Sequence, residues 1–206
     1  MARPAIGFYW TLPVPWAGFT SLSADPEEAA GQSRTIRYQR EVIRRYAKEN
    51  GFELVAEHVF LEIEPDRVSD QMQATLVSLR TLMRAKGAAL LVVDFAREHG
   101  QRRNYHLKEL AREASLAVEE IEAGPLMIAG KLFDPARHFS NWRARQYAWS
   151  DNKAERVAAA LARAHELQAK GHGLAAIAER LNTEGLRSAT GKPWTPDSLR
   201  KALKAN

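Results

Sequence analysis

Short, nearly continuous apolar runs recur along the first half of the chain. Three of them predict β-strands, and the first and third are typical of strands that are covered on both faces. They are Ala5–Trp10, Phe52–Leu61 and Ala88–Phe95. A fourth run, Leu116–Ile121, contains two glutamates among its apolar residues and predicts an edge strand.

Between these runs the apolar residues fall at helical spacing. The predicted helices are Ser33 to about Asn50, a helix through Leu76, Leu79, Leu82 and Met83 that ends at Gly87, and Tyr105–Ser115. Residues 11–32 are rich in Pro, Gly and Ser and predict a long irregular loop, and Glu62–Gln71 predicts a polar one. Strands that alternate with helices indicate an α/β fold with a mostly parallel sheet flanked by helices.

From Asp151 onward the apolar pattern is helical throughout. Asp151–Lys170 predicts one helix. A second helix has its apolar face at i, i+3, i+4 and i+7, namely Leu174, Ile177, Ala178 and Leu181. We expect Asn182 and Gly185 to end it, because both residue types tolerate the left-handed backbone conformation of a helix stop.

A third helix is expected to begin at Thr195. Thr195 can cap free N–H groups, Pro196 suits the first helical position, and Asp197 complements the positive end of the helix dipole. The apolar stripe of this helix is Leu199, Ala202 and Leu203. The cations Arg200, Lys201 and Lys204 are therefore expected to face solvent.

A packed helix followed by a basic one is the arrangement of a helix-turn-helix reader of DNA. The side chains expected to contact DNA here are Arg187, Lys192, Thr195, Ser198, Arg200, Lys201 and Lys204. Residues 151–206 carry ten Lys/Arg and six Asp/Glu, so +4 of the net charge of +5 lies in them. Contacts to phosphates require such an excess. The alternative is a small helical hairpin with a solvated basic face.

Composition excludes several classes of protein. The chain has no cysteine, which rules out disulfides, thiolate zinc sites and a cysteine nucleophile. Its six histidines show no metal-ligand spacing, and neither a metal nor another cofactor is expected. There is no membrane-spanning apolar run and no secretory signal. We therefore expect a cytoplasmic, nucleoid-associated protein of bacterial or phage origin.

The C-terminal string IAERLNTEGLRSATGKPWTPDSLRKALKAN resembles the DNA-binding "recombinase" domain of large serine recombinases. The matching positions are Ile177, Ala178, Leu181, Asn182, Gly185, Leu186, Gly191, Trp194, Thr195 and Asp197–Lys204. The segments QREVIRRYAKENGFELVAEHVF and LLVVDF resemble the catalytic domain of the same family. The resemblance implies a resolvase-like domain over residues 1–125, a basic and aromatic linker over 126–150, and a helix-turn-helix domain over 151–206.

The catalytic positions depart from this family. Its Tyr-x-Arg-x-Ser signature after the first strand places Trp10 and Leu12 at the arginine and serine positions. If the long loop is an insertion, Ser23 becomes the candidate nucleophile, still without the arginine. The family's other arginine motifs fall on Gln73-Ala74 and on Asp94-Phe95-Ala96-Arg97-Glu98. Nearby cations that could substitute are Arg67, Arg97, Arg102 and Arg103.

Losing one preorganised charge donor typically slows a reaction by about 10²–10³-fold. Losing several should abolish strand transfer, so no catalytic residue is expected.

The connecting segment Lys131–Trp149 interleaves aromatic residues with cations. In the resembled family this region carries a dimer helix and an arm that follows the minor groove. Arg143 and Arg145 are therefore candidates for a second DNA contact. The alternative is that the aromatic residues pack the two domains together.

These observations favour a sequence-specific protein that binds double-stranded DNA as a homodimer or higher oligomer. It would act as a transcriptional regulator or an accessory DNA-architecture factor, with the N-terminal domain serving dimerisation or recruitment of a protein partner. One alternative is an active recombinase that forms a phosphoseryl–DNA intermediate at Ser23. The other is a protein-interaction module with an incidental basic tail.

Overall fold

The computed structural model describes residues 2–62, 70–95, 112 and 116–205. The chain divides into two compact units, and the division does not follow the order of the sequence. The first unit comprises Met1–Pro13 and Ser21–Asn141, and the second comprises Val14–Thr20 and Trp142–Asn206. A short segment near the N-terminus therefore folds with the C-terminal helices.

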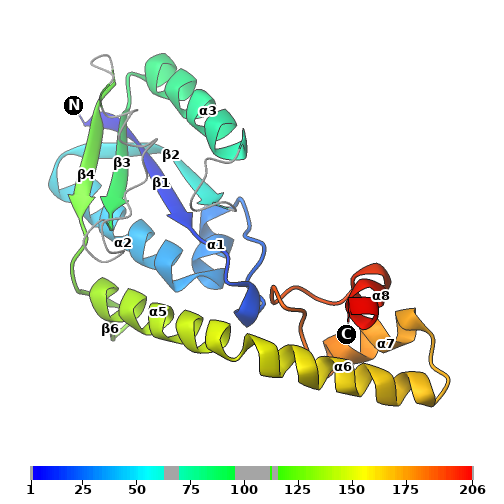
Figure 1. Ribbon diagram of the computed structural model, residues 1–206. Helices are drawn as coiled ribbons and strands as arrows, with labels where there is room; N and C mark the ends of the chain where they lie inside the picture. The colour runs from blue at the N-terminus through cyan, green and yellow to red at the C-terminus, as the bar shows by residue number, and fades with distance from the viewer. Residues whose placement is uncertain (1, 63–69, 96–111, 113–115, 206) are drawn as a thin grey trace. The chain divides into compact units, whose positions relative to one another are not determined.

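A four-stranded parallel sheet forms the centre of the first unit (Figure 1). Its strands, in spatial order, are β2 (Phe52–Leu61), β1 (Arg3–Thr11), β3 (Ala89–Asp94) and β4 (Val118–Glu122). Neighbouring strands all pair in parallel. The sheet confirms the predicted α/β class, and β4 is the expected edge strand.

The central strand β1 is buried on both faces, which explains its continuous apolar sequence. Ala5 and Tyr9 point into one core cluster, and Ile6 and Phe8 point into the other. This alternation follows the two-residue period of a strand. All four side chains are inaccessible to solvent, so the sheet needs a cover on each side.

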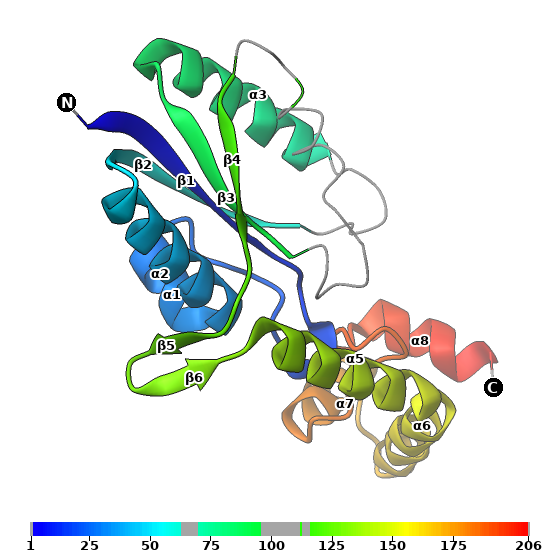
Figure 2. The same cartoon turned by 90° about the vertical axis from the view of Figure 1, so that its left-hand side faces the viewer.

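Helices cover both faces of the sheet (Figure 2). One face is covered by α1 (Pro26–Gln32), α2 (Arg34–Glu49), the hairpin of β5 (Leu126–Ile128) and β6 (Lys131–Phe133), and the start of α5 (Pro135–Asp151). The other face is covered by α3 (Asp70–Lys86), which buries Leu76, Leu79 and Met83. The predicted helices before Asn50 and Gly87 are thus confirmed.

The prediction of an irregular loop over residues 11–32 is wrong for its second half, because Pro26–Gln32 forms α1. Asp25 caps this helix by accepting hydrogen bonds from the N–H groups of Glu27 and Glu28. Pro26 occupies the first turn, where its missing N–H has no cost. The sequence contained this start signal, which the Pro- and Gly-rich surroundings obscured. Pro15–Ala17 forms a short 3₁₀ turn in the first half.

Some expectations fall outside the described residues. These are the helix at Tyr105–Ser115, most of the loop at Glu62–Gln71, and the substitute arginines Arg67, Arg97, Arg102 and Arg103. The segment 126–150, expected to be a linker, contains the β5–β6 hairpin and most of α5. The boundary between the two units falls inside α5.

Tyr38 fastens α2 to the chain that follows β4. Its hydroxyl donates to the Gly124 carbonyl oxygen at 2.7 Å and accepts from the Gly124 N–H at 2.8 Å. Its buried ring stacks on Phe133 with 4.7 Å between centroids. One side chain therefore satisfies both polar groups of Gly124 and supports the hairpin.

Tyr38→Phe is expected to lower the free energy of unfolding by about 1–3 kcal/mol, because both backbone groups of Gly124 lose their partner while the ring packing survives. Urea denaturation followed by circular dichroism measures this. Tyr46→Phe is the control, since Tyr46 lies on the same helix, is only partly buried and stacks on Phe52. Equal stability of the two variants would contradict the role of the Tyr38 hydroxyl.

Candidate nucleic-acid interface

The C-terminal helices of the second unit share one apolar core (Figure 1). They are α6 (Lys153–Ala169), α7 (Leu174–Thr183) and α8 (Pro196–Ala205). The buried core residues are Ala160, Leu161, Ala164, Leu167, Ile177, Ala178, Leu181, Trp194 and Leu199. The apolar faces predicted from helical spacing are confirmed, and Trp194 joins them from the turn between α7 and α8.

Asn182 ties this turn to α7. Its Oδ1 accepts from the Trp194 N–H at 2.7 Å, and its Nδ2 donates to the Trp194 carbonyl oxygen at 2.9 Å. The expectation that Asn182 ends the helix in a left-handed conformation is wrong, because the residue lies inside α7. Gly185 alone takes that conformation, with φ of 76°. Asn182 instead fixes the point at which the chain enters α8.

The start of α8 is capped as predicted. Thr195 Oγ1 accepts from the Ser198 N–H at 3.1 Å, and Ser198 Oγ accepts from the Thr195 N–H at 2.9 Å. This reciprocal pair satisfies two of the N–H groups that a helix start leaves free. Thr195 and Ser198, both proposed DNA contacts, therefore also hold the first turn of α8 in shape.

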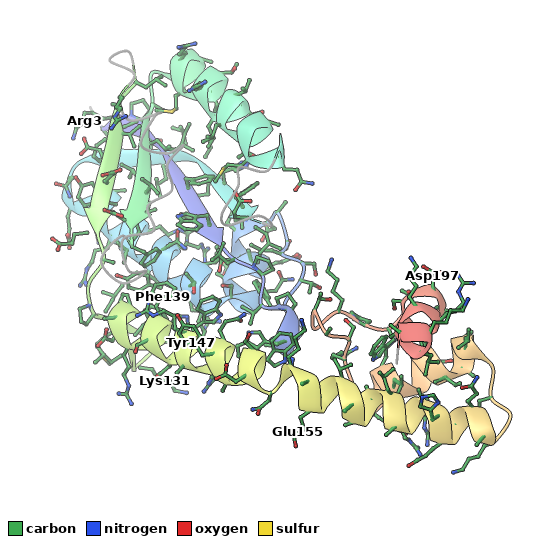
Figure 3. The ribbon with its side chains drawn as sticks, viewed as in Figure 1. Arg3, Lys131, Phe139, Tyr147, Glu155 and Asp197 are labelled. Atoms are coloured by element: carbon green, nitrogen blue, oxygen red, sulfur yellow. The ribbon has the colours of Figure 1, made fainter. Side chains whose placement is uncertain are left out.

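The charged face of α8 is organised around Asp197 (Figure 3). Asp197 forms ion pairs with both Arg200 and Lys201, the latter at 2.9 Å between Nζ and Oδ2. Lys201 and Arg200 hold the pKa of the Asp197 carboxyl below its usual range. All three side chains are more than half exposed. Such surface ion pairs contribute little to stability. Another anion can therefore readily replace the carboxylate as the partner of the cations.

The structure brings part of the predicted set together. Thr195, Ser198, Arg200 and Lys201 lie on the first turns of α8, and the exposed Lys204 follows one turn later. Arg187 and Lys192 lie in the connection between α7 and α8, where Gly191 N–H donates to Ser188 O at 2.9 Å. Arg143 and Arg145 belong to a separate element, the second half of α5.

An ion network that the sequence pattern did not predict joins α6 to the end of α7. Arg163 forms two hydrogen bonds with Glu184, at 2.9 and 2.8 Å, and Arg180 Nε donates to the same carboxylate at 2.9 Å. These two guanidinium groups lower the pKa of Glu184 to about 2. Arg163 also pairs with Glu166, so two cations of the basic C-terminal region already have two carboxylates as partners. Arg163 and Glu184 are 21 residues apart in the sequence, so no local pattern indicates that they pair.

The segment Val14–Thr20 is part of this unit. Trp16 Nε1 donates to Gln146 Oε1 at 2.7 Å. A Cβ atom added to Gly191 would lie 3.0 Å from Trp149 Cζ2 and 3.2 Å from the backbone N of Trp16. The loop that follows β1 thus reaches the turn that precedes α8, a contact that the sequence pattern did not predict.

The aromatic residues of the connecting segment pack within the individual units. Phe133 and Phe139 are buried in the core of the first unit. In the second unit the guanidinium carbon of Arg156 lies 3.8 Å from the Trp149 ring centroid. Of this aromatic set, Tyr147 is exposed. Packing therefore accounts for most of the aromatic residues that alternate with the cations.

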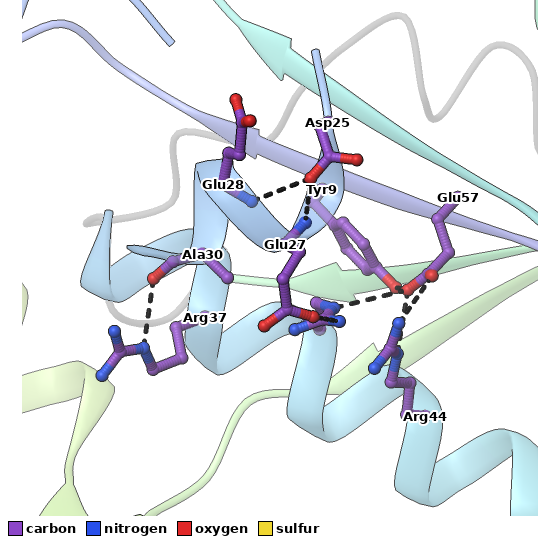
Figure 4. Close-up of polar contacts among 9 residues, drawn as sticks. Tyr9, Asp25, Glu27, Glu28, Ala30, Arg37, Arg44 and Glu57 are labelled. Carbon is purple, nitrogen blue, oxygen red and sulfur yellow. Dashed lines mark hydrogen bonds and ion pairs between the residues drawn. The ribbon is translucent and has the colours of Figure 1, made fainter. Parts of the chain in front are cut away.

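An ion network joins β1, β2 and α2 in the first unit (Figure 4). Tyr9 OH donates to Glu57 Oε1 at 2.6 Å, and Arg44 binds both oxygens of Glu57 at 3.0 and 2.7 Å. Burial and this hydrogen bond raise the pKa of Tyr9, while Arg44, against the effect of burial, keeps the pKa of Glu57 low. Arg40 forms an ion pair with Glu27. Arg40 and Arg44 of α2 are therefore directed at protein carboxylates.

Ser23 lies at the start of α1, among acidic residues. Its Oγ donates to Glu28 Oε2 at 2.8 Å and accepts from the Asp25 N–H at 3.1 Å. Its own N–H donates to Gln32 Oε1 at 2.8 Å. These contacts make Ser23 part of the cap of α1.

Comparison with known proteins finds one family that matches the C-terminal helices. Residues 155–206 match the protein-family model described as Recombinase, which supports a relationship to the serine recombinases. No curated protein and no solved structure matches the chain. No described helix is both long enough and apolar enough to cross a membrane. Within the described ranges, no cluster of three His, Asp or Glu side chains could hold a metal ion.

Gly191→Ala is expected to destabilise the second unit more than Gly185→Ala. Both glycines have φ near 80°, so alanine costs about 1–2 kcal/mol at either position. Only at Gly191 would the added methyl group also press on Trp149 and the Trp16 backbone.

Denaturation followed by tryptophan fluorescence suits this test, because Trp16, Trp142, Trp149 and Trp194 all lie in the second unit. Equal losses in the two variants would show that Trp16 and Trp149 do not pack against Gly191.

Proposed function

We propose that this chain is a sequence-specific protein that binds double-stranded DNA and descends from serine recombinases. It acts as a transcriptional regulator or an accessory DNA-architecture factor, without strand-transfer activity. The observation that carries the proposal is the family match over α6, α7 and α8, combined with an anchored α8 that presents exposed cations.

The first turns of α8 are the part that would enter the major groove. Arg200 is suited to the paired acceptors of guanine, and Lys201 and Lys204 to phosphates or base acceptors. In the free protein Asp197 already holds Arg200 and Lys201 on one face of α8. On DNA, phosphate or base acceptors would replace Asp197 as their partner. The helix therefore meets DNA with these side chains partly ordered.

The modest net charge of +4 in residues 151–206 favours a dimer. Two copies of α8 on two half-sites would double the number of phosphate contacts and lengthen the DNA sequence that is read. Arg143 and Arg145 would add minor-groove contacts from α5. A cytoplasmic, nucleoid-associated location follows from this function.

The surroundings of Ser23 argue against strand transfer. A serine that attacks a phosphodiester needs cations to hold the phosphate and to stabilise its developing charge. Ser23 is bonded to Glu28 and to the N–H of Asp25, whose carboxylate caps the same helix. This negative potential would repel DNA. Arg40 and Arg44 are committed to Glu27 and Glu57.

One observation favours the second candidate, an active site-specific serine recombinase. Ser23 Oγ donates a hydrogen bond to a carboxylate, Glu28, which is the geometry of a serine beside a general base. In this alternative, Ser23 would become covalently linked to a DNA phosphate.

Arg200→Ala or Lys201→Ala is expected to weaken binding by about 1–3 kcal/mol if the side chain contacts a base. The DNA site is first selected from a pool of random duplexes, and fluorescence anisotropy then measures the affinity. Lys204→Ala should instead weaken binding to all sequences and reduce the salt slope by about 1, as expected for a phosphate contact.

Arg45→Ala is the matched control, because Arg45 is also paired along its helix, with Glu49, but belongs to the first unit. Wild-type affinity in both the Arg200 and Lys201 variants would contradict the proposed interface.

No covalent protein–DNA species is expected when wild-type protein is incubated with its selected site and denatured. The same result is expected for Ser23→Ala, which should keep wild-type DNA affinity. An adduct that forms with wild-type protein and disappears in Ser23→Ala would establish the recombinase alternative.

A further inference from the structure

The first unit contains a hollow between the start of α2 and the β5–β6 hairpin, which lie beside each other in Figure 2. Its volume is about 470 Å³, enough for one or two large side chains. It is lined by Arg34, Arg37, Ile128, Ala129, Lys131, Leu132 and Phe133. These residues include three cations and no carboxylate.

Among the residues that the structure describes, none of these three cations forms an ion pair with a carboxylate. The guanidinium carbon of Arg34 lies 5.8 Å from the Phe133 ring centroid. Arg37 Nε donates to the Ala30 carbonyl oxygen at 3.1 Å (Figure 4), an interaction that does not involve an acidic group. Lys131 is exposed on the hairpin (Figure 3). The hollow is therefore positive at its rim and apolar on Ile128 and Phe133.

An exposed apolar pair adjoins the hollow. Met127 and Leu132 are direct cross-strand partners on the hairpin, and 60% and 62% of their surfaces are exposed. Single exposed apolar residues are common on protein surfaces, whereas adjacent ones often mark interaction sites. Leu132 also lines the hollow, so the apolar pair and the cations form one continuous surface.

We propose that this surface binds a protein segment in which acidic side chains flank a bulky apolar one. The carboxylates would pair with Arg34, Arg37 and Lys131, and the apolar side chain would enter the hollow against Phe133. Charge complementarity selects an acidic partner. The apolar pair favours a peptide over duplex DNA, whose phosphate backbone offers nothing to cover Met127 and Leu132. The site lies wholly in the first unit and does not depend on DNA binding by α8.

The test uses the full-length protein and a fluorescein-labelled synthetic peptide of alternating glutamate and leucine or phenylalanine, with binding measured by anisotropy. Saturable binding is expected, and Arg34→Glu and Lys131→Glu should each weaken it about tenfold or more through like-charge repulsion. Lys48→Glu is the matched control, because it reverses a charge at the other end of α2, and it should change the affinity less than about twofold.

A second peptide and a variant of the hairpin test the apolar part of the site. Replacing the leucine and phenylalanine residues of the peptide by serine should abolish binding, and Leu132→Ser should weaken it about fivefold. The variants are folded if their circular dichroism spectra match that of the wild-type protein. Equal binding of the serine peptide, or displacement by inorganic phosphate alone, would reduce the site to a simple anion site and overturn the proposal. Absence of peptide binding would also overturn it.

DNA affinity is measured on the same samples. It should be the same for Arg34→Glu, Lys131→Glu and Lys48→Glu. A selective loss in the first two would make this surface an auxiliary DNA contact and would contradict the proposal. Failure of all samples to bind DNA would contradict the proposed function and leave the peptide result intact.

Discussion

Asn182 holds the backbone of Trp194 through two hydrogen bonds, and this fixes the chain where it enters α8. α8 has only 10 residues, and an isolated helix shorter than about 12–15 residues is marginal in water. Its stability therefore comes from this anchor, from the cap formed by Thr195 and from burial of Leu199. The exposed cations of α8 can serve as a recognition surface only because the helix under them is held in place.

In the first unit, by contrast, two arginines pair with carboxylates of the protein and stabilise the fold. Arg40 and Arg44 lie on α2, where their guanidinium groups meet Glu27 and Glu57. A partly buried carboxylate such as Glu57 needs these partners, because an unpaired charge in that position would be costly. An arginine held in this way is not available for a phosphate. The unit therefore combines a parallel sheet flanked by helices with a polar network that stabilises it.

The distribution of paired and unpaired cations says more about interactions than the net charge of +5. Between α6 and α7, Arg163 and Arg180 pair with the carboxylates of Glu184 and Glu166, so their charges are balanced. α8 carries three cations and a single carboxylate, Asp197, which pairs with Arg200 and Lys201, so two positive charges remain in excess. The hollow beside the β5–β6 hairpin has cations and no acid. Two surfaces with an excess of positive charge result, one in each unit.

The sequence by itself determined the strands of the sheet, α2, α3 and the three C-terminal helices, because burial imposes a two-residue or a helical period on neighbouring residues. It also indicated the capping role of Thr195 and the exposed cations of α8. The tertiary structure alone decided that Asn182 binds Trp194, that Glu184 binds Arg163, and that Val14–Thr20 joins the C-terminal unit. These contacts join residues that are distant along the chain, and local periodicity carries no information about which distant groups meet.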